Sequence, residues 1–217
     1  MPASLYAAET WQRLGVDNGV QIDTREVASS PLPEFRGTAV VAADMYEVLA
    51  VLDDLRLHCE WQKRCVQAKE LRRESAFERL FYSRVGAPWP LQDRDVVLRG
   101  RVSFVGAGAE LLVTFEQVRD ARWPAYGGVV RMPVVRGHYR LTRIDVEKTK
   151  VEFQVLADPG GMVPAWAAKL TARQVPRDTL VGLRNYLPKI KGKYAAFLQI
   201  WRTKPANGPI GPTATDR

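Results

Sequence analysis

The chain has 217 residues, a length that fits one medium-sized domain with a core of its own. Hydrophobic residues make up 46% and charged residues 26%, and no run of about 18 uninterrupted apolar residues could span a bilayer. The net charge of +8 suits a nucleic acid, an anionic membrane surface, or simply a well-solvated surface. No helix-turn-helix, finger or glycine-aromatic strand motif accompanies this charge, so we expect no nucleic-acid partner.

The N-terminus and the cysteines set expectations about location and metals. The first fifteen residues lack the basic start, apolar core and small-residue cleavage site of a secretion signal, so we expect a cytoplasmic protein. Cys59 and Cys65 have five residues between them and lie near His58. Structural zinc needs four well-spaced ligands, so we predict ordinary, partly buried thiols, no metal site and no cofactor.

The N-terminal part predicts a mixture of helices and strands. Stretches 19–27 and 34–42 alternate apolar and polar residues around a proline-rich link, which predicts two paired strands. Residues 43–62 have helical spacing, with Asp44 as the predicted N-cap. At the very start, apolar residues at spacings of three, closed by a glycine, predict a short amphipathic helix: Leu5, Ala8, Trp11, Leu14 and Gly15.

The middle of the chain predicts an antiparallel meander. Its alternating stretches are bounded by short polar or glycine-bearing turns, which argues against β-α-β units. With the first two strands they give a sheet of eight strands; the six stretches are 64–73, 76–85, 94–104, 110–118, 134–144 and 149–158.

The C-terminal part returns to helical spacing. Pro176 and Pro188 are predicted to punctuate it. We expect one domain over residues 1–203 and a disordered tail over 204–217. Three apolar stripes predict the helical faces: Val163, Trp166, Ala167 and Leu170; then Leu180, Leu183 and Leu187; then Ile190, Tyr194, Phe197, Leu198 and Trp201.

A sheet of this size needs a cover, and the long C-terminal helix is the obvious one. If the twisted sheet curls around that helix, space can remain beneath it. Along 94–104, Val96, Leu98, Val102 and Phe104 share one apolar face with Gly100, which forfeits packing and suggests a bend or room for a ligand. We expect a hydrophobic ligand to contact Phe81, Val96, Leu98, Gly100, Val102, Leu111, Val113, Phe115, Tyr139, Phe153, Val163, Trp166, Leu170 and Leu183.

Several separated motifs, in the right order, resemble the START domain, the steroidogenic-acute-regulatory-related lipid-transfer family. They are "GVQIDTREVASSPLPEFRG" (19–37), "LDDLRLHCEWQ" (52–62), "PWPLQDRDVV" (88–97) and "DPGGMVPAW" (158–166). The match covers about residues 19 to 187. A bacterial-type, single-domain member is implied, with a helix-grip fold of class α+β. In that fold a curved antiparallel sheet wraps around a long C-terminal helix and encloses an internal apolar cavity, and there is no catalytic chemistry.

The resemblance also assigns roles to motif residues. Trp89, Arg94 and Asp95 match its tryptophan corner and Arg-Asp pair, and they are expected to stabilise the structure or its gate; an exposed salt bridge would contribute little. Gly100 and Phe81 stand where sterol-binding members often carry a buried charged pair. The turn into the C-terminal helix is represented by Asp158, Gly160, Gly161 and Pro164.

These features predict a non-catalytic protein that binds and transfers, or senses, one lipid. A dozen buried methylenes stabilise a ligand by about 10 kcal/mol relative to water, whereas transfer from a bilayer is near neutral. A shuttle therefore needs a gate, for which we consider the C-terminal helix and loop 119–130, where Trp123 and Tyr126 adjoin two glycines. An ordinary loop packed on the sheet edge is the alternative.

Two further expectations concern partners and catalysis. We expect a monomer that could bind peripherally to an anionic membrane surface. The basic residues that could attract it there are Arg173, Arg177, Arg184 and those of the run 189–194, and a solvated helix face is the alternative. A helix-grip enzyme, such as a cyclase or dehydratase acting on a polyketide-like substrate, is the alternative function. Its possible acids and bases are not convincingly inward: Tyr82, Glu110, His138 and Asp158.

Overall fold

The computed structural model describes residues 10–28, 30–163, 165–196, 198 and 199. Its strands are β1 Gln12–Asp17, β2 Val20–Arg25, β3 Glu34–Val41, β4 Cys65–Arg73, β5 Glu78–Val85, β6 Asp93–Val105, β7 Glu110–Gln117, β8 Val129–Arg131, β9 Val134–Arg143 and β10 Thr149–Asp158. Its α-helices are α1 Met45–Asp53, α2 His58–Trp61 and α3 Ala165–Tyr186, and its 3₁₀ helices are η1 Leu55–Leu57, η2 Gly106–Gly108 and η3 Leu187–Ile190.

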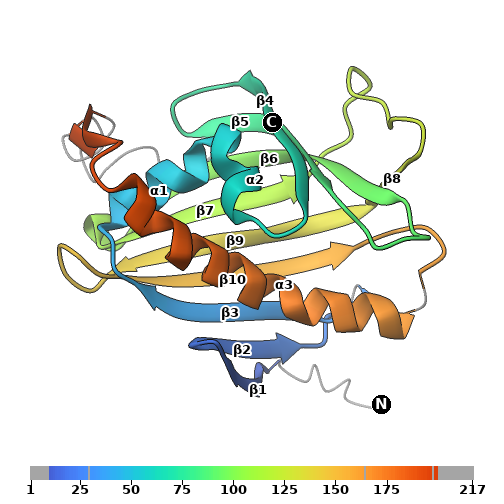
Figure 1. Cartoon of the computed structure of the whole chain (residues 1–217), viewed down its shortest axis with the longest axis horizontal. Coiled ribbons are helices and arrows are strands. Elements are labelled where there is room, and N and C mark those ends of the chain that lie inside the picture. Colours follow the sequence, from blue (N-terminus) through green and yellow to red (C-terminus); the bar gives the residue numbers. More distant parts are fainter. Residues whose placement is uncertain (1–9, 29, 164, 197, 200–217) are drawn as a thin grey trace, which may run out of the picture.

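All described strands belong to one sheet, in the order β1-β2-β3-β10-β9-β7-β6-β5-β4 (Figure 1). Neighbours along this path are antiparallel, whereas the short strand β8 pairs in parallel with the start of β6. The predicted α+β class, with an antiparallel sheet and a C-terminal helix, is confirmed. The expected eight strands were too few, because β1 and β8 were not foreseen.

The predicted N-terminal helix is wrong where the structure describes it, because residues 12–17 form β1. Asn18 and Gly19 make the turn to β2 with positive φ angles of 51° and 72°. An Asn-Gly pair is a strong hairpin signal, since both central residues of this turn type need positive φ. The pairing of β1 with β2 therefore overrides the apolar spacing. Residues 1–9, including Leu5 and Ala8, lie outside the described residues.

Helix α1 begins where predicted. The Asp44 carboxylate accepts a hydrogen bond from the Tyr46 backbone N–H at 2.8 Å, and Glu47 completes a capping box. The predicted single helix over 43–62 is nevertheless divided, because α1 ends at Asp53 and α2 begins at His58. This break turns α2 back toward β4.

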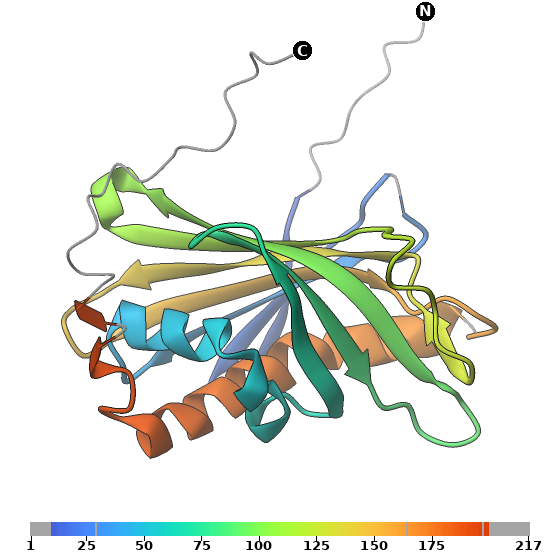
Figure 2. The ribbon, with the colours of Figure 1, turned by 90° about the horizontal axis from the view of Figure 1, so that it is seen from above.

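The three α-helices lie on the concave side of the curved sheet (Figure 2). Helix α3 crosses β2, β3 and β10, and it reaches the β3 backbone at Gly37, where a Cβ atom would lie 2.8 Å from Pro176. Pro176 lies inside α3, so it does not punctuate the helix as predicted. Leu180 and Leu183 are completely buried in the core that α3 closes.

Three other features of the chain complete the fold. Cys59 and Cys65 form a disulfide, so the prediction of two thiols is wrong; the turn from α2 to β4 brings their Cα atoms to 4.7 Å. Of the third apolar stripe, Ile190 and Leu198 are buried, while Phe197 and Trp201 lie outside the described residues, as does the tail. No helix in the described ranges is long and apolar enough to cross a bilayer.

Candidate functional site

A pocket of about 280 Å³ lies between the concave face of the sheet and the helices. Strands β5, β6, β7, β9 and β10 supply its apolar wall. The remaining wall comes from the end of α1, helix α2, the turn between α2 and β4, the end of β4, the turn before β5 and the middle of α3. The pocket is thus mostly apolar, with a cluster of charged side chains on one side.

The structure places most of the sequence-predicted ligand contacts on this wall. Those in the lining are Phe81, Val96, Leu98, Gly100, Val102, Val113, Phe115, Tyr139 and Phe153. Leu111 and Leu183 instead lie in the filled core. Val163 is half-buried and apart from the described lining, and the side chains of Trp166 and Leu170 lie outside the described residues.

Aromatic rings dominate the centre of the apolar wall. Tyr139 and Phe153 stack with ring centroids 4.4 Å apart, and Phe115 lies 6.0 Å from each of them. Burial raises the pKa of Tyr139, so its hydroxyl stays neutral. The space above Gly100 is partly filled, because a Cβ there would meet the Phe81 ring at 3.1 Å. The glycine therefore accommodates an aromatic side chain of the protein itself.

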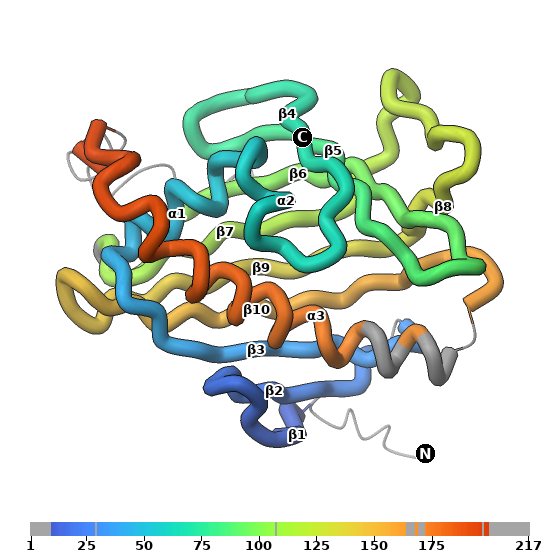
Figure 3. The backbone as a smooth tube through the Cα atoms, in the orientation of Figure 1, coloured from blue at the N-terminus to red at the C-terminus, as the bar shows by residue number. Residues whose placement is uncertain are grey.

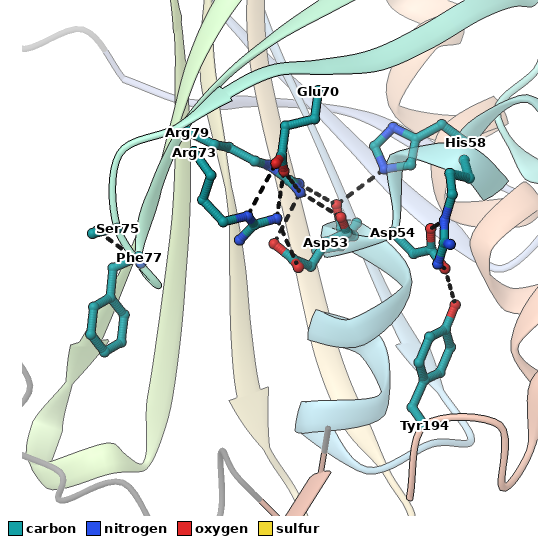
Figure 4. Close-up of polar contacts among 11 residues, drawn as sticks. Asp53, Asp54, His58, Glu70, Arg73, Ser75, Phe77, Arg79 and Tyr194 are labelled. Carbon is teal, nitrogen blue, oxygen red and sulfur yellow. Dashed lines mark hydrogen bonds and ion pairs between the residues drawn. The ribbon is translucent and has the colours of Figure 1, made fainter. Parts of the chain in front are cut away.

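Charged residues gather where α1 ends (Figure 4). Arg79 pairs with the Asp53 carboxylate at 3.0 Å and donates a hydrogen bond to the Leu52 carbonyl at 2.9 Å. Arg73 lies 3.3 Å from the same carboxylate and 2.6 Å from Glu70. Arg79 caps the last carbonyls of α1, where the helix dipole favours a cation. Asp53, Arg73 and Arg79 all line the pocket.

His58 lies beside this cluster and is itself part of the lining. Its Nε2 is 3.1 Å from the Leu52 carbonyl, and its Nδ1 is 3.2 Å from Nε2 of Gln62. A neutral ring satisfies both contacts if Nε2–H donates and Nδ1 accepts. Burial lowers the pKa of His58 to about 4. The imidazole is therefore a structural hydrogen-bonding group at neutral pH.

Sequence reasoning did not foresee this polar side of the pocket. Strand alternation could have found Arg79, because it shares the inward face of β5 with Phe81 and Ser83. His58 and Asp53 carried no comparable signal, since their position depends on the break between α1 and α2. The sequence thus predicted the apolar wall better than the polar one.

A pH dependence of stability follows from His58. Its folded pKa lies below the unfolded value near 6.5, so the unfolded chain binds the proton more tightly. Stability is therefore lost as the pH falls from about 6.5 to about 4, and the loss attributable to this group is about 3 kcal/mol. Urea unfolding of the wild type and His58→Gln at several pH values in this window measures it. The variant should show the shallower slope, and parallel curves would contradict the assignment.

A solved STAR-related lipid transfer protein from Xanthomonas axonopodis is 32% identical to this chain, with a TM-score of 0.75. The match covers 82% of this chain and 98% of that one. This chain belongs to the STAR-related lipid transfer, or START, family. The predicted resemblance is confirmed.

Other relatives of this START domain are more distant. Protein PA1579 of Pseudomonas aeruginosa is 29% identical, and the match covers 84% of this chain and 89% of the relative. The phosphatidylcholine transfer protein of Bos taurus is 23% identical, with 81% and 85% of the two chains covered. No protein-family model matches the chain.

The Arg-Asp motif of this START domain is buried, so it is not the exposed salt bridge that we considered. Asp95 is completely buried and pairs with Arg131, with its two carboxylate oxygens 2.7 and 3.1 Å from the guanidinium. Arg131 also donates to the carbonyls of Trp123 and Pro124. Arg94 is 6% exposed and donates to the Gln92 carbonyl. Asp95 therefore anchors the loop that precedes β8.

The Asp-Pro-Gly-Gly turn of the START domain has a local structural role. The Asp158 carboxylate accepts a hydrogen bond from the Gly160 N–H at 2.8 Å. Gly160 and Gly161 have φ angles of +63° and +68°, which favour glycine. Pro164 lies outside the described residues. The turn redirects the chain from β10 into α3.

The predicted gate loop lies on the outer side of the sheet. The ring of Tyr126 contacts Tyr82 edge-on at 5.6 Å between centroids, and Lys69 lies over the Trp123 ring at 5.5 Å. Neither Trp123 nor Tyr126 belongs to the pocket lining that the described residues define. Trp89, in the β5–β6 loop, is 92% exposed. These aromatics therefore lie apart from the pocket.

The candidate acids and bases of the alternative enzyme also lie apart from it. Within the described lining, Tyr82, Glu110, His138 and Asp158 are absent. Burial, with a smaller effect of Asp95, raises the pKa of Tyr82 to about 12. Glu110 pairs with Arg140 at 2.7 Å, and His138 lines a charged hollow on the convex face. Their positions give no support to a role at the pocket.

Proposed function

We propose that this START domain binds one amphipathic lipid in the pocket, with its hydrocarbon against the sheet and its polar end near α1 and α2. The observation that carries the proposal is the pairing of an aromatic and aliphatic wall with a charged side in a single pocket. A ligand with one apolar and one polar end matches both surfaces. The name of one relative, phosphatidylcholine transfer protein, adds support from the family.

The size of the pocket restricts what fits without rearrangement. Its 280 Å³ lies just below the usual range of about 300–1,000 Å³ for small-molecule sites. A single acyl chain or another compact hydrocarbon group is the natural occupant, and a two-chain lipid would require the helices to move away from the sheet. Because acyl chains are already in an apolar medium within a bilayer, exchange between membrane and pocket is close to neutral in free energy. That balance suits a carrier or sensor.

The polar end of the ligand would meet mostly basic side chains. The lining contains five cations and three carboxylates: Lys63, Arg64, Arg73, Arg79 and Arg101 against Asp53, Glu78 and Asp178. Asp53 already engages Arg73 and Arg79, which holds their guanidinium groups in place. An anionic or zwitterionic headgroup is therefore favoured over a cationic one.

Native mass spectrometry of the purified full chain tests this proposal. We expect a bound species whose mass matches a lipid, retained under gentle desolvation. Incubation with vesicles that contain labelled lysophosphatidylcholine or phosphatidylcholine should then load the emptied protein. Absence of lipid in both experiments would contradict the proposal, whereas loading by the single-chain probe alone would support the size restriction.

Contact with a membrane would occur at the end of the molecule where α3 begins. The β5–β6 loop, the loop before β8 and the β10–α3 connection lie at that end (Figure 1). They expose large apolar side chains: Trp89, Leu91, Tyr126 and Met162. Exposed aromatic residues of this kind favour the membrane interface. The cations Arg177 and Arg184 are less available than expected, since they contact Asp17 and the Asn18 carbonyl.

A further inference from the structure

The disulfide between Cys59 and Cys65 closes a short loop that lies against the C-terminal half of α3 (Figure 3). Residues of this loop contact α3 at three points. The Lys63 ammonium lies 3.0 Å from the Asp178 carboxylate. Tyr186 donates a hydrogen bond to Glu60 at 2.9 Å. We call residues 59–65 the cysteine loop.

The third contact is between backbones. A Cβ atom on Gly182 would lie 2.0 Å from the Trp61 carbonyl oxygen, so only glycine allows α3 to approach this closely. Asp178, Gly182 and Tyr186 follow at spacings of four, which places them on one face of the helix. The cysteine loop therefore contacts one continuous face of α3.

The same loop borders the pocket. Gln62, Lys63 and Arg64 line it from one side, and Asp178 and Thr179 line it from α3. Any outward movement of α3 that enlarges the pocket must loosen these contacts. The cysteine loop is thus placed to control how readily a ligand enters and leaves.

We propose that the Cys59–Cys65 pair is a redox-modification site that acts as a latch on α3. This inference rests on the proposed lipid-binding function. The disulfide restricts the loop and holds its three contacts in register, and its reduction allows the loop and α3 to separate. Cys59 is exposed and Cys65 is half-buried, so a small reductant can reach the bond.

The chemistry is thiol–disulfide exchange with a dithiol reductant. One thiolate of the reductant attacks a sulfur of the pair, which forms a mixed disulfide and releases one cysteine thiolate. The second thiol of the reductant then displaces the other cysteine. Two electrons pass to the protein, two protons complete its two thiols, and the reductant becomes a disulfide. Oxidation of the thiols by another disulfide reverses these steps.

The test uses the full-length protein, loaded with fluorescently labelled lysophosphatidylcholine and transferred to excess unlabelled vesicles. We expect reduction to accelerate dissociation about tenfold, which corresponds to about 1.4 kcal/mol. Cys59→Ser/Cys65→Ser should release at the reduced rate with or without reductant. Glu60→Ala should accelerate release in the oxidised protein, because it removes the hydrogen-bond acceptor of Tyr186 on α3, and Glu60 does not belong to the described pocket lining. The exposed control Glu147→Ala should not.

Amide hydrogen exchange without lipid separates the latch from the lipid-binding proposal. Reduction should increase exchange in residues 178–186 while β9 stays protected. If no lipid binds but this local increase occurs, the binding proposal fails and the latch stands. The latch is overturned if oxidised and reduced proteins exchange and release alike, if β9 loosens equally, or if alkylation shows two free thiols in air-oxidised protein.

Discussion

Leu98→Arg is expected to weaken lipid binding by at least about 100-fold, because a desolvated guanidinium without a partner would occupy the apolar wall. Leu98 is 6% exposed and lines the pocket beside Val96 and Phe81. Leu98 faces the pocket, which has space for a larger side chain, so the fold should survive with reduced stability. Binding of labelled lysophosphatidylcholine, followed by fluorescence, measures the effect.

Val105→Arg provides the matched control. It introduces the same side chain at the end of the same strand, where the native residue is 36% exposed and does not belong to the described lining. Circular dichroism and cooperative thermal unfolding should show that both variants are folded. Lipid binding by folded Leu98→Arg at the wild-type level would refute the proposal that the ligand lies against Leu98.

The apolar wall could be predicted because strand alternation is a local property. Once residues 94–104 are assigned to a strand, the side chains of Val96, Leu98 and Val102 must share a face. The same logic applied to β5 places Phe81 and Arg79 together. Alternation alone does not say which face of the sheet is concave. The resemblance to the START family does, because it implies a sheet that curves around the C-terminal helix.

The features that were missed depend on contacts between distant segments. Strand β8 has three residues, and only its pairing with β6 makes it a strand. The polar side of the pocket exists because α1 stops at Asp53 and Arg79, from a strand far along the chain, caps its end. The spacing of apolar residues within one segment cannot predict a contact between β5 and the end of α1.

The disulfide and the partner of Asp95 also depend on how the chain folds and could not be predicted from local sequence patterns. Spacing alone does not reveal that Cys59 and Cys65 meet, because the turn between α2 and β4 brings them together. Arg94 and Asp95 are adjacent in the sequence and were expected to stabilise the structure or its gate, but the sequence does not say which residue each one contacts. In a strand, adjacent side chains point to opposite faces, so Asp95 takes its partner from β8.

Asp95→Asn is expected to lower the free energy of unfolding by about 3 kcal/mol, since it removes one partner of a buried ion pair. Asp95 is completely buried, whereas the Arg131 side chain is 21% exposed, so the loss should lie at the lower end for such pairs. Asparagine keeps the shape and isolates the effect of charge. Urea unfolding at pH 7 measures it, with the exposed Asp145→Asn as the control that should leave the midpoint unchanged.

The part of the chain that loses amide protection in Asp95→Asn shows whether Asp95 anchors one loop or stabilises the whole domain. Arg131 also holds the carbonyls of Trp123 and Pro124, so a weakened Asp95 contact should free the loop before β8. Amide exchange should therefore rise first in residues 119–130, at urea concentrations where β9 and β10 remain protected. An unchanged midpoint, or a loss spread evenly over the sheet, would contradict the anchoring role of Asp95. The exposed apolar end of the domain would then owe its conformation to other contacts.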